Sequence, residues 1–171
     1  MWKMLKTPAA GICSLRQKFS TKTLDETNRK LYNTEKEIRK MARMIYVATR
    51  TKNGKISEHF KVSEFRCKDG TEEFLYAPEL FYILEKIREH FNSPVIINSG
   101  YRTPAWNTKV GGSGNSYHCK GMAADIRVKE HTSKEVAEYA SEIMKNYGGV
   151  IRYTNFVHVD VREECYRKGV K

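Results

Sequence analysis

The sequence lacks the features that define several large classes of protein. No apolar run approaches the roughly 18 residues that a membrane-spanning helix needs, so no transmembrane segment is expected. Only 11 glycines and 4 prolines occur among the 171 residues, and no stretch repeats, which excludes collagen-like and low-complexity architectures. The length allows one compact domain and a tail, but not two full domains.

Cysteine is scarce as well. The four cysteines, Cys13, Cys67, Cys119 and Cys165, are widely separated and form no CxxC pair, which argues against a cysteine-rich zinc module. A disulfide framework is also poorly supported, because such frameworks are typical of much smaller secreted domains. We therefore expect mostly free thiols.

An excess of one charge is confined to the N-terminal part of the chain. Residues 1–52 contain 13 Lys and Arg against 4 Asp and Glu, whereas residues 53–171 contain 18 against 16. Most of the net charge of +11 therefore belongs to the first segment. Because the rest of the chain is nearly neutral, the charge does not predict a nucleic-acid-binding domain.

We expect residues 1–52 to form a basic leader, disordered at first and then helical. Residues 1–24 contain only basic charges, which is typical of transit peptides but also of poorly ordered tails. Residues 24–47 carry a narrow apolar stripe at helical spacing. Such a helix can dock on the following domain, pair with another chain or lie on an anionic surface, and the sequence does not choose among these. The polar turn at 51–55 predicts that a second unit covers residues 53–171.

The second unit is predicted to be an α+β domain with a small, mainly antiparallel sheet flanked by helices. Helices are expected at residues 77–91 and from 132 to the glycines at 148 and 149, and strands at 95–99, 122–128, 150–153 and 156–162. Residues 100–116 are rich in Gly, Asn, Thr and Pro and are expected to form a long loop. Loops of that length inside compact domains are usually functional.

Three side chains, His118, Asp125 and His158, are candidates for chemistry. Strand periodicity turns Asp125 away from its apolar neighbours, and likewise turns His158 and Asp160 to one face. A carboxylate in such a strand is costly to bury unless it is paired or binds a metal. Two imidazoles and a carboxylate make a three-ligand set for zinc, with a fourth position for water. Single histidines and aspartates on strands are nevertheless more often structural, so the pattern alone leaves both interpretations open.

Three separated blocks of the sequence occur in an order that resembles a known family. They are 99–104 with Asn107 and 110–112, the pattern SxHxxGxAxD at 116–125, and the sequence FVHVDVR at 156–162. Together they resemble the zinc D-Ala-D-Ala carboxypeptidase family, which includes bacterial cell-wall carboxypeptidases and phage endolysins. The resemblance covers about residues 55–165. It implies the fold shared with the hedgehog signalling domain (hedgehog/DD-peptidase) and one Zn²⁺ ion.

The resemblance also implies roles for individual residues. His118, Asp125 and His158 match the zinc ligands of the family. Arg102 matches an arginine that helps to hold the substrate and stabilise the oxyanion, although it can also be no more than the partner of an acid. Ser116 matches a residue that lines the substrate cleft.

One position departs from the family pattern. Many members have Glu or Asp three residues before the last histidine, where this chain has Asn155. An amide cannot accept a proton as a carboxylate does. Asp160 is the nearest carboxylate and is, with Arg102, a candidate catalytic residue. It can be the general base or the partner that orients His158, and we favour an orienting or substrate-positioning role.

The function that the resemblance implies is hydrolysis of peptide bonds in the stem peptides of bacterial peptidoglycan through a metal-activated water. A D,D-carboxypeptidase and an endolysin-type endopeptidase both fit. With no clear secretory signal, the expected place of action is the bacterial cell envelope, or the cell wall as the target of a phage-encoded enzyme. The basic leader can then contact anionic wall polymers.

Two other functions stay open from the sequence. Asn155 favours a non-catalytic zinc module of the same fold that binds the cell wall or a protein partner. The leader's charge suggests a nucleic-acid-associated protein, but the nearly neutral domain argues against it, and no specific nucleic-acid partner is expected.

Overall fold

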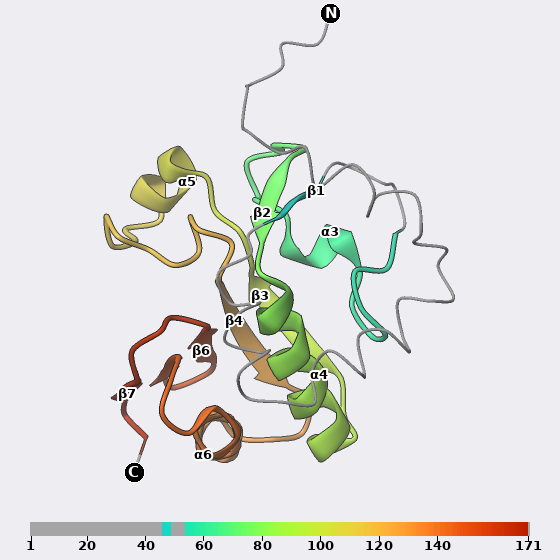
Figure 1. The fold of residues 1–171 in the computed structure, drawn as a ribbon, viewed down its shortest axis with the longest axis vertical. Helices are drawn as coiled ribbons and strands as arrows, with labels where there is room; N and C mark the ends of the chain where they lie inside the picture. The colour runs from blue at the N-terminus through green and yellow to red at the C-terminus, as the bar shows by residue number, and fades with distance from the viewer. Residues whose placement is uncertain (1–45, 49–53, 171) are drawn as a thin grey trace, which may run out of the picture.

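A five-stranded sheet forms the centre of the structure (Figure 1), a computed structural model that describes residues 46–48 and 54–170. Its strands are β3 (Val95–Ser99), β4 (Ala123–Val128), β5 (Gly149–Arg152), β6 (Val157–Asp160) and β7 (Tyr166–Lys168). They lie in the order β3-β4-β6-β5-β7. Neighbours are antiparallel except for β5 and β7, which are parallel. The predicted α+β domain with a mainly antiparallel sheet is therefore confirmed.

Two helices cover one face of this sheet and contact each other. In α4 (Pro78–Phe91), a proline occupies the first turn, where no backbone N–H is needed. In α6 (Ser133–Met144), Thr132 and Glu135 form the predicted capping box. The buried residues Leu80, Leu84, Ile87, Val136, Ala140 and Met144 line the helix side of the core. No described helix is both long and apolar enough to cross a bilayer.

The strands supply the other side of the core with alternate residues. Ala124, Ile126, Val128, Val150, Val157 and Val159 are all buried in the core cluster. Because strand side chains alternate between the two faces, Asp125 and His158 emerge on the face away from the two helices. The hydrophobic pattern that forms the core thus also determines which polar residues meet on the opposite face.

Smaller elements surround the sheet. A two-stranded sheet pairs β1 (Tyr46–Ala48) with β2 (Phe74–Tyr76). Residues 46 and 47, at the end of the predicted leader helix, are thus in a strand and not in a helix, because they pair with β2. Ala48 is also in this strand, and the rest of the predicted leader lies outside the described residues. The short helix α3 (Val62–Phe65) packs against β3, and α5 (Pro104–Lys109) lies within the segment expected to be a loop.

Candidate metal centre

Two of the predicted ligands meet because their strands are neighbours. β4 and β6 pair in a register that places Asp125 directly opposite His158. Their side chains therefore share the face away from the helices, and Asp125 Oδ1 lies 2.9 Å from His158 Nδ1. The alternation of side chains along a strand predicts the face on which each of these residues lies. The register of the two strands then brings the side chains of Asp125 and His158 together.

His118 reaches the same place from the turn that precedes β4. Its Nε2 atom lies 3.2 Å from Asp125 Oδ1 and 3.1 Å from His158 Nδ1. The three ligand atoms all lie within 4.8 Å of one another. Hydrogen bonds from the N–H groups of Arg102 and Gly121 to the His118 carbonyl oxygen hold this turn in place. The three residues that the sequence singled out are therefore brought together.

The hydrogen bonds on the far side of each imidazole indicate where its lone pair points. His118 Nδ1 lies 2.7 Å from the carbonyl oxygen of Gly100, so Nδ1 carries a proton and Nε2 faces the cluster. His158 Nε2 lies 2.9 Å from Asp160 Oδ2, so Nδ1 faces the cluster in the same way. Two nitrogen lone pairs and a carboxylate oxygen at this separation repel one another unless a cation or a proton lies between them.

The donor set fits zinc. Tetrahedral zinc with bonds of about 2.0–2.1 Å places neighbouring ligand atoms about 3.3 Å apart, close to the spacing of the cluster. Two imidazole nitrogens and one carboxylate oxygen are typical zinc ligands, and three protein ligands leave a position for water or substrate. His118, Asp125 and His158 are thus the residues that would hold the ion.

Asp125 is buried yet ionised. Burial by itself raises the pKa of its carboxyl group, but its interactions with the imidazoles of His118 and His158 more than offset this and hold the pKa well below its usual range. The second carboxylate oxygen accepts a hydrogen bond from Arg102 Nη2 at 2.5 Å, while Arg102 Nε donates to Ser99 Oγ at 2.8 Å. Arg102 therefore forms an ion pair with Asp125. Pairing with an acid was one of the two roles that the sequence suggested for Arg102.

Asp160 contacts His158 and not the centre of the cluster. Its side chain is completely buried, and both oxygens are in use. Oδ2 accepts from His158 Nε2 and Arg162 Nη2, and Oδ1 accepts from Arg162 Nε and from the Arg162 backbone N–H. Burial raises the pKa of Asp160, but the bonds from Arg162 and His158 outweigh it and lower the pKa to about 2. A carboxylate held in this way orients a histidine ligand.

A family comparison agrees with this geometry. A family model described as Peptidase M15 matches residues 58–160. The chain belongs to the Peptidase M15 family. The matched segment contains the whole cluster, and comparison with curated proteins finds no match. M15 peptidases are zinc-dependent, so the predicted family is confirmed and the expected metallopeptidase and zinc cofactor are supported.

The remaining M15 candidates lie at different distances from the cluster. Ser116 is buried in the turn before His118, and no hydrogen bond in the described chain joins its hydroxyl to the ligand atoms. Asn155 is exposed in the turn between β5 and β6. Among the described residues, Asp125 and Asp160 are the carboxylates that contact the two histidines of the cluster.

Two supports of the M15 site were missed by sequence reasoning. The Arg162 guanidinium lies between the rings of Tyr117 and Tyr166, with centroid distances of 4.3 and 4.9 Å, which fixes the arginine that holds Asp160. Gly149 provides the space for that carboxylate, since a Cβ there would lie 2.2 Å from Asp160 Oδ2. The alternation of side chains along β6, continued to residue 162, could have indicated a role for Arg162, but nothing local marks Gly149.

Proposed function

We propose that this protein is a zinc-dependent peptidase that hydrolyses peptide bonds in the stem peptides of bacterial peptidoglycan. The observation that carries the proposal is the convergence of His118 Nε2, Asp125 Oδ1 and His158 Nδ1, with both imidazole lone pairs directed at the same point. Membership of the M15 family supports the choice of a peptidoglycan substrate.

The chain's own residues have separate roles in this proposal. Zinc, when bound, polarises the scissile carbonyl and activates water. His118 is oriented by the Gly100 carbonyl and His158 by Asp160, so neither ring has to rotate for catalysis. Arg102 pairs with Asp125, and we assign to its guanidinium the further role of holding the substrate and stabilising negative charge on the carbonyl oxygen.

Asp160 is a positioning residue in this proposal and not the general base. Its two oxygens accept four hydrogen bonds, so no lone pair is left for the proton of an attacking water. Asn155 lacks a carboxylate at the position where many family members have one. These two observations favour the second candidate function, a zinc module of the same fold that binds the cell wall or a protein partner without cleaving it.

Digestion of purified peptidoglycan tests the proposal. Zinc-loaded wild-type protein is expected to release products that mass spectrometry identifies either as loss of a terminal D-Ala or as an endopeptidase cut. His118→Ala should lose at least about 1,000-fold in rate, because it removes a ligand. His59→Ala is the control, since His59 bonds to Glu85 away from the cluster.

The outcomes separate the two candidate functions. Tight zinc binding with no turnover on peptidoglycan would favour the non-catalytic module. Equal turnover by wild type and His118→Ala would reject the metal site as the source of activity. The products also distinguish the two enzyme types, whereas origin from a phage or from a bacterial envelope stays a proposal.

A further inference from the structure

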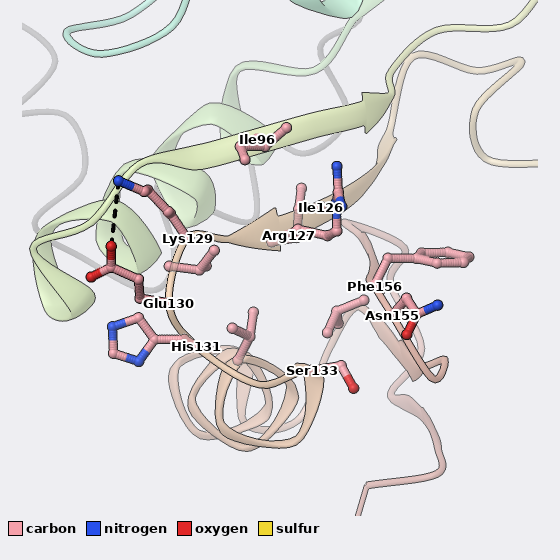
Figure 2. Close-up of a pocket in the computed structure, with 12 residues that line it drawn as sticks. Ile96, Ile126, Arg127, Lys129, Glu130, His131, Ser133, Asn155 and Phe156 are labelled. Atoms are coloured by element: carbon pink, nitrogen blue, oxygen red, sulfur yellow. Dashed lines mark ion pairs between the residues drawn. The ribbon is translucent and has the colours of Figure 1, made fainter.

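Two cavities lie away from the ligand atoms of the cluster. The larger, of about 320 Å³, is shown in Figure 2. Lys129 pairs there with Glu130 at 3.3 Å, the ion pair drawn in the figure. Arg127, at the same cavity, donates from Nε to Asn98 Oδ1 at 3.1 Å. The charged side chains of this cavity thus have partners within the chain, and its buried wall is apolar and belongs to the core.

The smaller cavity, of about 170 Å³, is lined by an arginine without a partner. Its lining residues are His59, Phe60, Glu64, Arg88, Pro94 and Val95. We call it the Arg88 pocket. Val95 begins β3, and Ser99, opposite Asp125, ends it, so about 13 Å of strand lies between the pocket and the cluster. The Arg88 pocket is therefore a separate site.

The guanidinium of Arg88 distinguishes this pocket. Its Nη1 atom is buried and has no hydrogen-bond partner, and no acid among the described residues forms an ion pair with it. A guanidinium has five N–H groups, and buried donors normally have acceptors. The fold has thus already removed part of the hydration of this charge, so a carboxylate that binds its accessible N–H groups has less water to displace.

The wall beside Arg88 is held in place by Glu85, one turn earlier on α4. One oxygen of Glu85 accepts hydrogen bonds from Ser57 Oγ at 2.5 Å and from the His59 backbone N–H at 2.9 Å, and the other lies 2.6 Å from His59 Nδ1. These bonds fix the segment before α3 on α4. Phe60, in that segment, is buried in the core. A site that is ordered before binding loses less conformational entropy when a ligand enters.

Glu64 brings a negative charge to the same pocket. Its Oε2 atom accepts a hydrogen bond from the Lys61 backbone N–H at 2.6 Å at the N-terminus of α3, and no described residue donates to Oε1. Glu64 and Arg88 therefore line one cavity without pairing with each other. Glu64 would repel a simple anion and Arg88 a simple amine, whereas a small molecule that carries both charges suits both walls.

We propose that the Arg88 pocket binds a small α-amino acid as its zwitterion. The carboxylate binds the Arg88 guanidinium, the ammonium group binds Glu64 Oε1, and a short apolar side chain packs against Phe60, Pro94 and Val95. The cavity volume equals that of about five to six water molecules in the liquid, which is room for a molecule the size of alanine. The inference does not rest on the proposed function, because it concerns binding at a different site.

NMR titration of the zinc-loaded chain with L-alanine and, separately, with D-alanine tests the proposal. We expect saturable shifts of the backbone amides of Phe60 and Val95 with a Kd of about 1 mM or tighter for at least one enantiomer. The absence of saturable shifts with both enantiomers up to about 50 mM would overturn the proposal.

Two fragments of the ligand test the recognition of both charges. Propionate lacks the ammonium group and ethylamine lacks the carboxylate, so each should bind at least about tenfold more weakly than alanine. Binding of either fragment as tight as that of alanine would contradict recognition of a zwitterion.

Charge-removing variants locate the binding. Arg88→Met should weaken alanine binding at least about tenfold, because charge-assisted hydrogen bonds to the carboxylate are lost. Glu64→Gln should also weaken it, while glutamine keeps an acceptor for the N-terminus of α3. Lys86→Met is the matched control, since Lys86 is on the same helix but pairs with Glu89 and does not line the pocket. Unchanged binding in Arg88→Met, or an equal loss in Lys86→Met, would overturn the assignment.

His118→Ala separates the Arg88 pocket from the metal centre, where zinc can itself bind an amino acid. The variant loses a zinc ligand but keeps the pocket, so alanine should shift the same amides with the Kd of wild type. Loss of these shifts would place the binding at the metal centre and overturn the proposal. Circular dichroism checks that each variant is folded. The titration measures no cleavage, so its result is independent of the peptidase proposal.

Discussion

Asp160 shows how a carboxylate that is not itself a metal ligand can orient one of the ligands. It is fully buried, it accepts one hydrogen bond from His158 and three from Arg162, and Arg162 lies between two tyrosine rings. Each contact restricts the next, so the orientation of one imidazole depends on a stacked guanidinium on the far side of the carboxylate. Such partners commonly affect metal affinity almost as strongly as the ligands do.

Asp160→Asn should therefore lower the affinity for zinc by about 10- to 100-fold. An amide has one acceptor oxygen and must present its NH₂ group to a donor, either His158 or Arg162, so one of the present bonds is lost. Competition with a chelator measures the affinity. Glu138→Gln, on the exposed side of α6, should leave the affinity unchanged. Wild-type affinity in Asp160→Asn would contradict the positioning role.

Glu79 is predicted to make the stability of the protein depend on pH. Burial raises its pKa to about 7 from an ordinary value of 4.5, and the Tyr147 side chain offsets part of the shift. Between pH 4.5 and 7 the folded protein holds a proton that the unfolded chain has lost, so the free energy of unfolding falls as pH rises through this window.

Glu79→Gln should remove this dependence. From pH 5 to pH 8, the unfolding free energy of the variant should gain about 2–3 kcal/mol relative to that of wild type. Denaturant titrations at the two pH values measure the difference. Parallel pH profiles for the two proteins would show that the Glu79 carboxyl group is ionised in the folded state already at pH 5.

At the scale of elements, the end of β3 links the packing of α3 to the metal cluster. Gly100 lies so close to the last residue of α3 that a Cβ would be 2.6 Å from the Phe65 Cα and carbonyl oxygen. The N–H of Tyr101 donates to that same oxygen at 2.8 Å, and the Gly100 carbonyl accepts from His118. The close approach of two backbones thus positions an acceptor for a ligand.

Gly100→Ala should destabilise the protein by about 2–3 kcal/mol, because the added methyl group meets backbone atoms that cannot move aside easily. It should also weaken zinc binding, since any shift of Gly100 moves the acceptor of His118. Denaturant unfolding and chelator competition measure the two effects. Gly114→Ala is the control, because a Cβ there meets no atom within 4 Å. Loss of stability with unchanged zinc affinity would contradict the link.

Elements with clear periodicity were predicted well from the sequence, and short ones were not. The strands that carry Asp125 and His158 alternate over enough residues for the face of each side chain to be predicted. β2 and β7 have three residues each, too few to show a pattern. The helix α5 was missed although Thr103 and Pro104 form a typical N-terminus, because the glycines nearby favoured a loop.

The place of His118 could not be predicted from local pattern. Turn residues have no period, and this turn is held by contacts with Gly100 and Arg102, which lie far from it in the sequence. The residue pattern named His118, Asp125 and His158 as candidates, and similarity to a family decided that they form the ligand set. The partners of Asp160 depend on Gly149, whose role is visible only when β5 lies beside β6.

At the scale of the whole molecule, zinc should stabilise the fold. The ligands come from β4, β6 and the turn before β4, so an ion that binds only the folded state connects these segments. At a zinc concentration about 1,000-fold above Kd the gain is about 4 kcal/mol, which corresponds to a rise of roughly 10 °C in Tm for a chain of this size.

Thermal unfolding with and without zinc measures this effect. His118→Ala should show a much smaller shift, and magnesium should have little effect on either protein, because it prefers oxygen ligands. Equal zinc shifts in wild type and His118→Ala would place the stabilising ion somewhere else in the chain.

The fold class was predictable at this scale, but the strand order was not. Alternating helices and hairpin-linked strands indicated an α+β domain with a mainly antiparallel sheet. The position of β6 between β4 and β5 depends on pairing between segments that are distant in sequence, and periodicity contains no information about partners.

The position of β6 also determines when the metal cluster can form during synthesis of the protein. His158 is on β6, which lies between β4 and β5 in the sheet, and both of these strands precede it in the chain. A nascent polypeptide in which β4 and β5 have left the ribosome, but β6 has not, has only two of the three ligands, His118 and Asp125. The three ligands can therefore come together only after residues 157–160 have been made and have paired with β4.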